Sequence, residues 1–469
     1  MDERLLAIRT LGELRRTGYR TQPVRMELRR NLLERLKRHE PVLPGIIGYE
    51  STVVPEIENG ILAGHHMILL GERGQAKSRI IRSLTGLLDQ HVPAVAGCEI
   101  NDDPYEPICR RCRRMARERG DELEIAWLAR EARYGEKLAT PDVSIADLIG
   151  EIDPIKVAEG RYLADEETIH YGLIPRTNRG IFAVNELPDL TEKVQVGLFN
   201  LMEEKDVQIK GYKIRLPLDV VFVASANPED YTSRGRIITP LKDRFDVQIR
   251  THYPKTIADE IAIMEQECSY PLDGTPPPRL ATFLKEILAQ LTFEARSSTE
   301  INQGSGVSVR MTINNLEAMI SNAEKRAIRN GENEIAPRLS DLAATYSATA
   351  GKIEPEYSGE ERNETELIER LTNRAVLKTF DRYFRTEELS AVVEQFRQGW
   401  SVEVGDSVLA ANYLDAIRQV PGLGAALDRL GPLETNGLKA AAIEFIFEGL
   451  HLHQKLNKER RGGRSSYHA

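Results

Sequence analysis

An eight-residue glycine loop, set between an apolar run and a helical pattern, constrains this chain more than any other feature. The loop reads Gly-Glu-Arg-Gly-Gln-Ala-Lys-Ser at residues 71–78, after the apolar run 67–70 and before a helix-like stretch at 79–84. This order is typical of a phosphate-binding loop, because inward-facing backbone N–H groups wrap a phosphate and the helix N-terminus adds partial positive charge. We expect Lys77 to reach the outer phosphates and the Ser78 hydroxyl to face Mg²⁺.

One position of the loop departs from the usual pattern, since Ala76 stands where glycine normally precedes the lysine. An ordinary turn between a strand and a helix is the simpler interpretation of such a match. The spacing and the flanking elements both favour phosphate binding over that alternative. The residues predicted to contact the nucleotide here are Gly71, Glu72, Arg73, Gly74, Gln75, Ala76, Lys77, Ser78 and Arg79.

Composition excludes several other classes of protein. The 63 basic and 72 acidic residues give a net charge of −9, which argues against a protein whose main task is to coat nucleic acid. No apolar run approaches the roughly 20 residues that cross a bilayer, and the charged start lacks the apolar stretch of a signal peptide. Four cysteines in 469 residues do not make a disulfide framework. We therefore expect a soluble, cytoplasmic protein that has no membrane contact.

Periodicity divides the chain into an α/β region and helical regions. Short β-rich runs alternate with helical patterns over 45–255, which predicts a parallel sheet flanked by helices, with strands at 67–70, 180–184 and 220–224. Apolar spacing predicts helices at 256–266, 280–291 and 308–329. The predicted segments are an N-terminal helical segment 1–40, an α/β domain 41–255 with an insertion at about 91–140, a helical domain 256–345, a C-terminal helical extension 346–458 and a disordered tail 459–469.

A second apolar strand ends in a polar pair that suits phosphate chemistry. Residues 180–184 lead into Asn185 and Glu186. Glu186 is positioned to polarise an attacking water. Asn185 stands where an aspartate normally holds the water shell of Mg²⁺, so the site loses one negative charge while the amide can still accept hydrogen bonds from metal-bound water. A core strand that runs into a surface turn is the alternative interpretation.

Two later polar residues extend this pattern. Asn227 comes soon after the predicted buried strand 220–224, at the strand end where open α/β sheets bind ligands, although it could also serve an Asn-Pro turn. Arg244 lies just after the sheet, and its permanent charge suits the phosphoryl oxygens of a neighbouring subunit's nucleotide. A surface ion pair between Arg244 and Asp243 is the alternative.

Together these segments resemble the AAA+ ATPases, and within them the clade of MoxR and the magnesium-chelatase ATPase subunits, over about residues 41–345. The loop 71–78 is similar to the clade's GERGTAKS form, in which alanine before the lysine is familiar. Residues 45–50, with Ile47 and Gly48, resemble the box at the adenine site. Residues 150–174 resemble the insert in the second helix, and 207–217 resemble the hairpin before the first sensor.

The resemblance also implies roles for three polar residues. Asn227 matches the first sensor, and Arg244 matches the arginine finger. Arg310 matches the second sensor on a helical lid that spans 256–345, with an exposed arginine at a helix start as the alternative. The implied fold is a three-layer α/β P-loop core with a parallel sheet, followed by the helical lid and a C-terminal helical domain.

What the family does is carried over as an expectation. The resemblance implies ATP binding and Mg²⁺-dependent hydrolysis in a homo-oligomeric ring, commonly a hexamer, in which the nucleotide sits between subunits. It implies remodelling of a partner protein, often one with a von Willebrand A domain, as in the MoxR-like chaperones.

Three other functions are considered, of which two stay open at this point. The chain could be the motor subunit of a magnesium chelatase, or a nucleotide-gated scaffold with little turnover, which the neutral Asn185 keeps in view. An activator of an alternative sigma factor is expected to carry the loop Gly-Ala-Phe-Thr-Gly-Ala, and this chain does not contain it.

The insertion at 91–140 carries a candidate metal site that the nucleotide-binding core does not need. Cys109 and Cys112 form a Cys-x-x-Cys pair, and Cys98 lies upstream. This spacing suits two thiolates on one tetrahedral Zn²⁺, and His91 is the candidate fourth ligand of a Cys₃His site. Ordinary reduced cysteines are the alternative. Cys268 falls in a helical pattern and is expected in the core.

Overall fold

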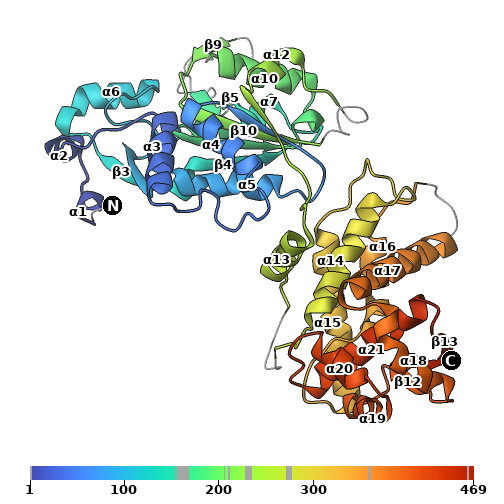
Figure 1. Ribbon diagram of the computed structural model, residues 1–469. Helices are drawn as coiled ribbons and strands as arrows, with labels where there is room; N and C mark the ends of the chain where they lie inside the picture. The colour runs from blue at the N-terminus through green and yellow to red at the C-terminus, as the bar shows by residue number, and fades with distance from the viewer. Residues whose placement is uncertain are drawn as a thin grey trace. The chain divides into compact units, whose positions relative to one another are not determined.

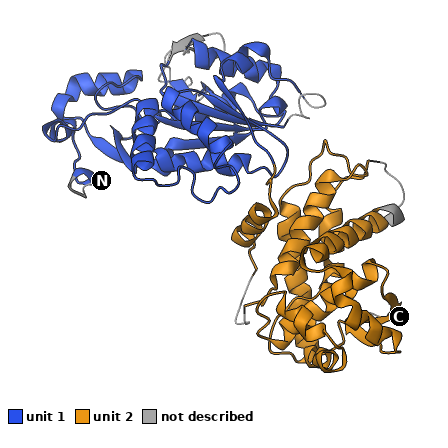
Figure 2. Cartoon of the chain, in the orientation of Figure 1, with its two compact units in different colours: residues 1–252 blue, residues 253–469 orange. Residues whose placement is uncertain are grey.

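The chain folds into two compact units, residues 1–252 and 253–469 (Figure 2). The computed structural model describes residues 3–153, 155, 168–204, 206–209, 212–227, 235–270, 277–356, 361–461 and 464–469. The predicted boundary between the α/β region and the helical region, near residue 255, lies close to the division between the units.

A parallel sheet of five strands forms the centre of the first unit (Figure 1). Its strand order is β11-β1-β10-β7-β4, and each neighbouring pair runs parallel. The three predicted strands are confirmed, because strands buried on both faces read as continuous apolar runs. The bounds are β1 Met67–Leu70, β4 Tyr134–Leu138, β7 Gly180–Asn185, β10 Val220–Ala226 and β11 Val247–Arg250.

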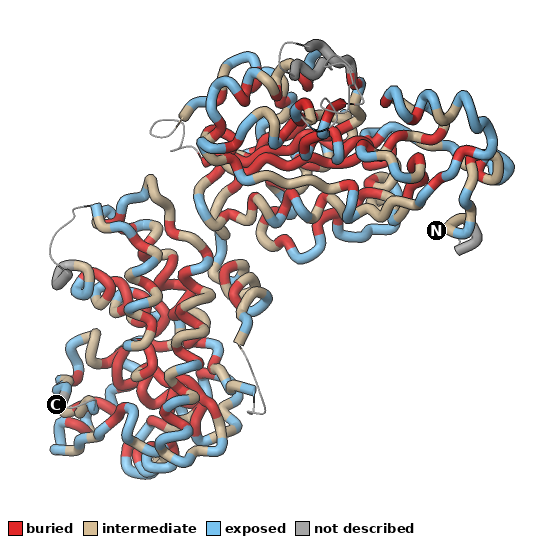
Figure 3. Tube along the Cα trace, turned by 180° about the vertical axis from the view of Figure 1, so that it is seen from behind, coloured by how far each residue is buried: buried red, intermediate tan, exposed pale blue. Residues whose placement is uncertain are grey.

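Helices cover both faces of this sheet and make the three predicted layers. Ile181 and Val221 pack on one side, whereas their neighbours Phe182 and Phe222 pack on the other, as the two-residue period of a strand requires. Figure 3 shows the middle of the sheet as a buried layer; β7 and β10 are buried throughout, whereas the edge strands β4 and β11 are mostly not. The first face is covered by α3 Val24–Lys37, α4 Val53–Ala63 and α5 Lys77–Ser83, and the second by α7 Ile145–Leu148, α10 Glu192–Glu203 and α12 Thr239–Asp243.

The predicted insertion is shorter than expected, because its last residues belong to the central sheet. Strand β4 pairs in parallel with β7, so the insertion ends before residue 134. Its own elements are the antiparallel pair β2 His91–Val95 and β3 Ile125–Ala129, together with α6 Arg110–Arg119. Helix α2 Leu11–Arg16, which follows the short helix α1 Glu3–Leu6, is tied to it, since the N–H of Leu11 donates to the carbonyl of Leu123 at 2.9 Å.

Two small antiparallel pairs accompany the sheet. The predicted hairpin at 207–217 is confirmed as β8 Asp206–Ile209 and β9 Tyr212–Arg215. The segment that resembles the clade's insert begins and ends in the pair β5 Gly150–Ile152 and β6 Ile169–Tyr171. Residues 154 and 156–167 of that segment lie outside the described residues.

The second unit is helical and has one apolar core. The predicted helices at 256–266, 280–291 and 308–329 are confirmed as α13 Ile257–Glu267, α14 Thr282–Ser297 and α15 Arg310–Asn330. The later helices are α16 Thr345–Ala350, α17 Glu361–Tyr383, α18 Ser390–Arg397, α19 Leu414–Gln419, α20 Leu423–Asp428 and α21 Asn436–Leu452. In the described part of the chain, no helix has the length and apolar character that would let it cross a bilayer.

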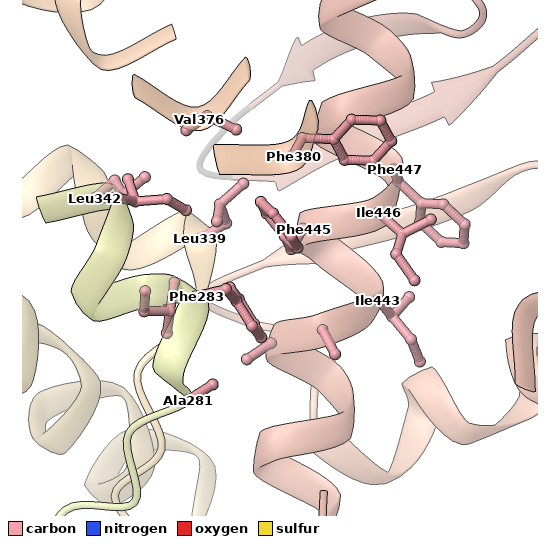
Figure 4. Close-up of a cluster of buried hydrophobic side chains, with 14 of the residues drawn as sticks. Ala281, Phe283, Leu339, Leu342, Val376, Phe380, Ile443, Phe445, Ile446 and Phe447 are labelled. Carbon is pink, nitrogen blue, oxygen red and sulfur yellow. The ribbon is translucent and has the colours of Figure 1, made fainter. Parts of the chain in front are cut away.

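The predicted division between a lid and a C-terminal extension at residue 345 is not a division between cores. Buried side chains from Met264 to Tyr467 form one cluster. Phe283 of α14 stacks on Phe445 of α21, with ring centroids 4.5 Å apart, and Phe380 of α17 packs on the same ring (Figure 4). The two predicted domains therefore share one core, because each alone would leave an apolar helix face in water.

The prediction of a disordered tail at 459–469 is wrong. The strands β13 Asn457–Arg461 and β14 Arg464–His468 pair with each other, and β14 also pairs with β12 Val402–Gly405. Tyr467 is 2% exposed, and its hydroxyl donates to the Glu448 carboxylate. The basic, polar composition of the tail concealed Tyr467, a buried side chain that anchors it.

We expect His66 to make the first unit less stable as the pH falls. Burial, helped by the nearby Arg25, lowers the pKa of His66 to about 4, and the backbone N–H of Phe222 donates to its Nδ1 at 3.0 Å. In the unfolded chain the pKa is about 6.5. Between pH 6.5 and 4 the unfolded state takes up a proton that the native ring refuses, so the free energy of unfolding falls by up to about 3 kcal/mol.

The measurement is urea unfolding at several pH values for wild type and the His66→Gln variant. Other groups also titrate in this range, so the informative quantity is the difference between the two pH profiles. His65→Gln removes a less buried histidine and serves as the control. Parallel profiles for wild type and His66→Gln would contradict the prediction.

Candidate nucleotide-binding site

The glycine loop connects β1 to α5, as predicted. Lys77 is the first residue of α5, and Ala76 before it has φ 56° and ψ 14°. This left-handed conformation costs an alanine about 1–2 kcal/mol relative to glycine. Gly74 is also left-handed, with φ 75°. Ala76 stands at the position where the pattern usually has glycine. Its left-handed backbone conformation explains why glycine is usual there.

Gly71 is required by a close approach of two side chains. A Cβ at this position would lie 1.9 Å from Oγ1 of Thr251 and 2.2 Å from Oε1 of Gln75. The Thr251 hydroxyl donates to Gln75 at 2.7 Å, and the N–H of Glu72 donates to the same oxygen at 3.1 Å. The Gln75 side chain therefore holds the loop against the end of β11, a structural role that the sequence did not predict.

The Lys77 ammonium group lies at the centre of the loop. Its side chain is 7% exposed, and Nζ donates to the carbonyl oxygens of Gly71 at 2.5 Å and Glu72 at 2.8 Å. It also donates to Oδ1 of Asn227 at 2.6 Å. A buried ammonium with three oxygen partners is held in one place. The lysine of the loop and the amide at the end of β10 are thus brought together.

Glu186 joins this network from the end of β7. Nδ2 of Asn227 donates to Oε2 of Glu186 at 3.0 Å, so Asn227 bridges the lysine and the carboxylate. Glu186 has φ 56° and ψ 46°, a left-handed conformation that is costly for a glutamate. Its N–H donates to Oγ of Ser225 at 3.3 Å. The sharp turn after β7 directs the carboxylate toward Asn227.

Asn185 sits beside the serine of the loop. Its Oδ1 accepts from the Ser78 hydroxyl at 3.5 Å and from the Ser225 hydroxyl at 3.3 Å, and the residue is 8% exposed. The two residues predicted to face Mg²⁺ are therefore neighbours. They are also joined to a residue that the sequence did not single out, because Nδ2 of Asn185 donates to Oε1 of Glu136 at 2.5 Å.

Glu136 supplies a carboxylate next to the neutral amide. Both of its oxygens accept from Arg82, at 2.8 Å each, and Oε2 also accepts from the Tyr134 hydroxyl at 3.0 Å. These hydrogen bonds hold the pKa of Glu136 below its usual range, and those from Arg82 have the largest effect. The carboxylate is therefore charged. The sequence analysis missed it because 134–138 was assigned to the insertion; recognising that segment as a core strand beside β7 would have found it.

The box at 45–50 lies against the glycine loop through a tyrosine. The Tyr49 hydroxyl lies 3.0 Å from the carbonyl of Gln75 and 2.6 Å from that of His252. Gly48 has φ 81°. Ile47 and Gly48, which are predicted to lie at the adenine end of the site, directly precede Tyr49, the residue that links their segment to the loop.

The two predicted arginines are not part of this network. Arg244 follows α12, and its Nε lies 2.8 Å from Oε2 of Glu203 on α10. Its Nη1 lies 3.9 Å from Oδ2 of Asp243. Its side chain is 36% exposed. Arg310 is the exposed first residue of α15 in the second unit. Their predicted roles remain predictions.

Several curated proteins that are similar in sequence to this chain are named as subunits of magnesium chelatase. No protein-family model matches the chain. The magnesium-chelatase subunit ChlI of Anabaena variabilis is 30% identical over 224 residues, which are 47% of this chain and 60% of that protein. The chain is similar in sequence to ChlI subunits of magnesium chelatase over about half of its length. The subunit ChlI of Chlorella vulgaris is 25% identical over 334 residues, 64% of this chain and 86% of that protein. The resemblance to the magnesium-chelatase clade of AAA+ proteins is confirmed.

The chain spans about three fifths of the length of the first curated relatives that it matches. Among solved structures, one similar chain belongs to a complex between subunits BchI and BchD of magnesium chelatase. The match covers 69% of this chain and 98% of that chain, with 18% identity and a TM-score of 0.34. NtrX from Brucella abortus in complex with ATP covers 74% of this chain and 67% of that one, with 14% identity and a TM-score of 0.41.

Proposed function

We propose that the chain binds ATP and hydrolyses it in a Mg²⁺-dependent reaction. The observation that carries this proposal is the continuous connection from Lys77 through Asn227 to Glu186. It links a residue suited to bind phosphate to a residue suited to polarise water, with a hydrogen-bonding amide between them. Such a chain of contacts has no evident purpose in a turn between a strand and a helix.

Each residue then has a defined task. Lys77 and the N–H groups of 71–78 bind and orient the outer phosphates. Glu186 accepts hydrogen bonds from the attacking water and orients it toward phosphorus, and Asn227 fixes the Glu186 carboxylate. Ile47 and Gly48 lie beside the adenine base of the nucleotide. The turnover rate depends on how well these groups are held before the substrate arrives.

The oxygen atoms beside the loop suit a magnesium ion. Mg²⁺ prefers oxygen ligands and keeps several of its waters. The Ser78 hydroxyl and the Asn185 amide oxygen lie together, and the charged Glu136 is one hydrogen bond away. These residues would hold Mg²⁺ and its water shell, and the bound ion would supply neutralisation of phosphate charge.

We further propose that hydrolysis in a homo-oligomeric ring, of which a hexamer is the expected form, remodels a partner protein that contains a von Willebrand A domain. Arg244 would complete the site of the neighbouring subunit, for which its partial exposure is suited. Arg310 would act as the second sensor that the resemblance implies. A magnesium-chelatase motor subunit is the second candidate, because the relatives carry that name.

The proposal is tested on the wild-type chain. We expect ATP to bind, phosphate release to require Mg²⁺ and to stop in excess EDTA, and ATP to shift the chain toward a ring in sedimentation. A chain that neither binds nor hydrolyses ATP at millimolar concentration would overturn it.

Two further experiments separate the candidate roles. Capture of partner proteins by a Glu186→Gln variant that is held with ATP would support a remodelling role. Metal insertion into a porphyrin in the presence of the other chelatase subunits would support the second candidate.

A further inference from the structure

Four side chains of the insertion converge at a point that the nucleotide chemistry does not use. They are Cys98, Asp102, Cys109 and Cys112, and one ligand atom from each lies within 4.8 Å of all the others. Cys98 and Asp102 lie in the loop after β2, Cys109 caps the N-terminus of α6, and Cys112 lies in the first turn of that helix. A loop and a helix start are thus held together by four potential ligands.

The separations suit a single tetrahedral ion. Zinc–sulfur bonds of about 2.3 Å place two sulfurs of a tetrahedron about 3.8 Å apart. A group in which every separation is within 4.8 Å needs only small side-chain adjustments to reach that geometry. Cys109 and Cys112 are 6% and 1% exposed, so their sulfurs are shielded from solvent.

Asp102 gives a second and independent indication of a ligand. Its side chain is fully buried, and Oδ2 accepts from the N–H of Cys109 at 2.9 Å. Its other oxygen, Oδ1, is buried and has no hydrogen-bond partner among the residues that the structure describes. An unpaired carboxylate oxygen in the interior is costly unless a cation or donor meets it. One of the two Asp102 carboxylate oxygens lies within 4.8 Å of the three cysteine sulfurs, which offer no strong donor but suit a cation.

The backbone around the cluster holds the ligands in place. The loop closes on itself, because the N–H of Val95 donates to the carbonyl of Asp102 at 3.0 Å. The N–H of Asp102 donates to Sγ of Cys98 at 3.4 Å, and the N–H of Cys112 donates to Sγ of Cys109 at 3.3 Å. Such N–H donors stabilise metal-bound thiolates and orient them.

We propose that Cys98, Asp102, Cys109 and Cys112 bind one structural Zn²⁺ ion. This ligand set replaces the expected Cys₃His site, because the fourth candidate ligand in the cluster is the Asp102 carboxylate and not the His91 ring. His91 lies on β2 opposite Ala129 and, among the described residues, is not part of the cluster. Three thiolates favour zinc over magnesium or calcium, and a site filled by four protein ligands is closed to substrate. The ion fastens the loop after β2 to the start of α6.

The first test is the metal content of protein purified without chelator. We expect about one zinc per chain, and less than a tenth of that in the Cys109→Ser and Cys112→Ser variants. Cys268→Ser, which changes the one cysteine outside the cluster, should keep the full content. Wild type without zinc that also fails to take up added Zn²⁺ at equimolar concentration would overturn the proposal, as would wild-type content in both variants.

The second test does not rely on variants that could fail to fold. X-ray absorption at the zinc edge of the wild-type chain should show three sulfur ligands at about 2.3 Å and one oxygen at about 2.0 Å. In chelator competition, Asp102→Asn should bind zinc at least about tenfold more weakly than wild type. Four sulfurs, or a nitrogen ligand, would overturn the ligand set. A count of two free thiols in the denatured chain instead of four would show a disulfide and overturn the site.

Discussion

Replacing Glu186 by glutamine is expected to lower ATP turnover about 10²–10⁴-fold while ATP binding stays within a few-fold of wild type. The amide has nearly the shape of the carboxylate and can keep the contact with Asn227, which lies 3.0 Å away. It lacks the charge that polarises the attacking water. Binding and hydrolysis are therefore expected to separate in this variant, as judged from titration with ATP and from steady-state phosphate release.

Two further variants define what the loss means. Lys77→Ala removes the buried ammonium at the centre of the loop and should abolish binding and hydrolysis together. Glu192→Gln makes the same chemical change at an exposed residue of α10, seven residues from the end of β7, and should keep wild-type activity. Turnover of Glu186→Gln at more than a tenth of the wild-type rate would show that another group polarises the water.

The second large effect is expected where the neutral Asn185 meets Glu136. Sequence analysis alone predicts that Asn185→Asp raises Mg²⁺-dependent hydrolysis by restoring a carboxylate. The structure adds that a charged Glu136 is already hydrogen-bonded to the Asn185 amide at 2.5 Å. We expect Glu136→Gln to lower Mg²⁺-dependent turnover about 10–100-fold, the usual worth of a hydrogen bond to a charged group.

The double variant Glu136→Gln/Asn185→Asp exchanges the positions of the amide and the carboxylate. It should recover most of the activity that Glu136→Gln loses, because one carboxylate again lies beside Ser78. In the single variant Asn185→Asp, two carboxylates would lie within hydrogen-bond distance, which raises the pKa of one of them and limits the gain. We therefore expect its increase in turnover to be largest above neutral pH.

Turnover as a function of Mg²⁺ concentration checks this prediction, with Glu131→Gln as the control. Glu131 is exposed and near Glu136 in sequence, and its pairing with Arg130 is local. A double variant no more active than Glu136→Gln would mean that Glu136 serves only to fix Arg82. Turnover of Asn185→Asp no higher than wild type would mean that the metal ion is held in another way. Very low turnover of the wild type itself would favour a nucleotide-gated scaffold.

Local pattern was sufficient for the parts of the site whose residues are close in sequence. The loop at 71–78 and its flanking strand and helix were predicted because glycine placement and an apolar run determine them without distant partners. The strands that deliver Glu186 and Asn227 were predicted for the same reason, since buried parallel strands are apolar throughout. The same holds for the pairing of Cys109 with Cys112, which share one helix turn.

Other parts depend on pairings that no local pattern contains. Glu136 reaches Asn185 only because β4 lies beside β7, and the same pairing takes residues 134–138 out of the insertion. Tyr467 orders a polar tail by packing against a helix that ends some fifteen residues earlier in the chain. Asp102, a carboxylate in a polar loop, becomes a candidate ligand only because the loop folds back onto α6.

The sequence by itself therefore determined the class of fold, the phosphate loop and the polar residues at the strand ends. The tertiary structure decided which charges and ligands surround them: the carboxylate beside Asn185, the aspartate beside the cysteines, and one helical core where two were expected. The physical reason is that hydrophobic periodicity and glycine placement act over a few residues. Strand order and burial, which decide what a polar side chain meets, depend on contacts between segments far apart in the chain.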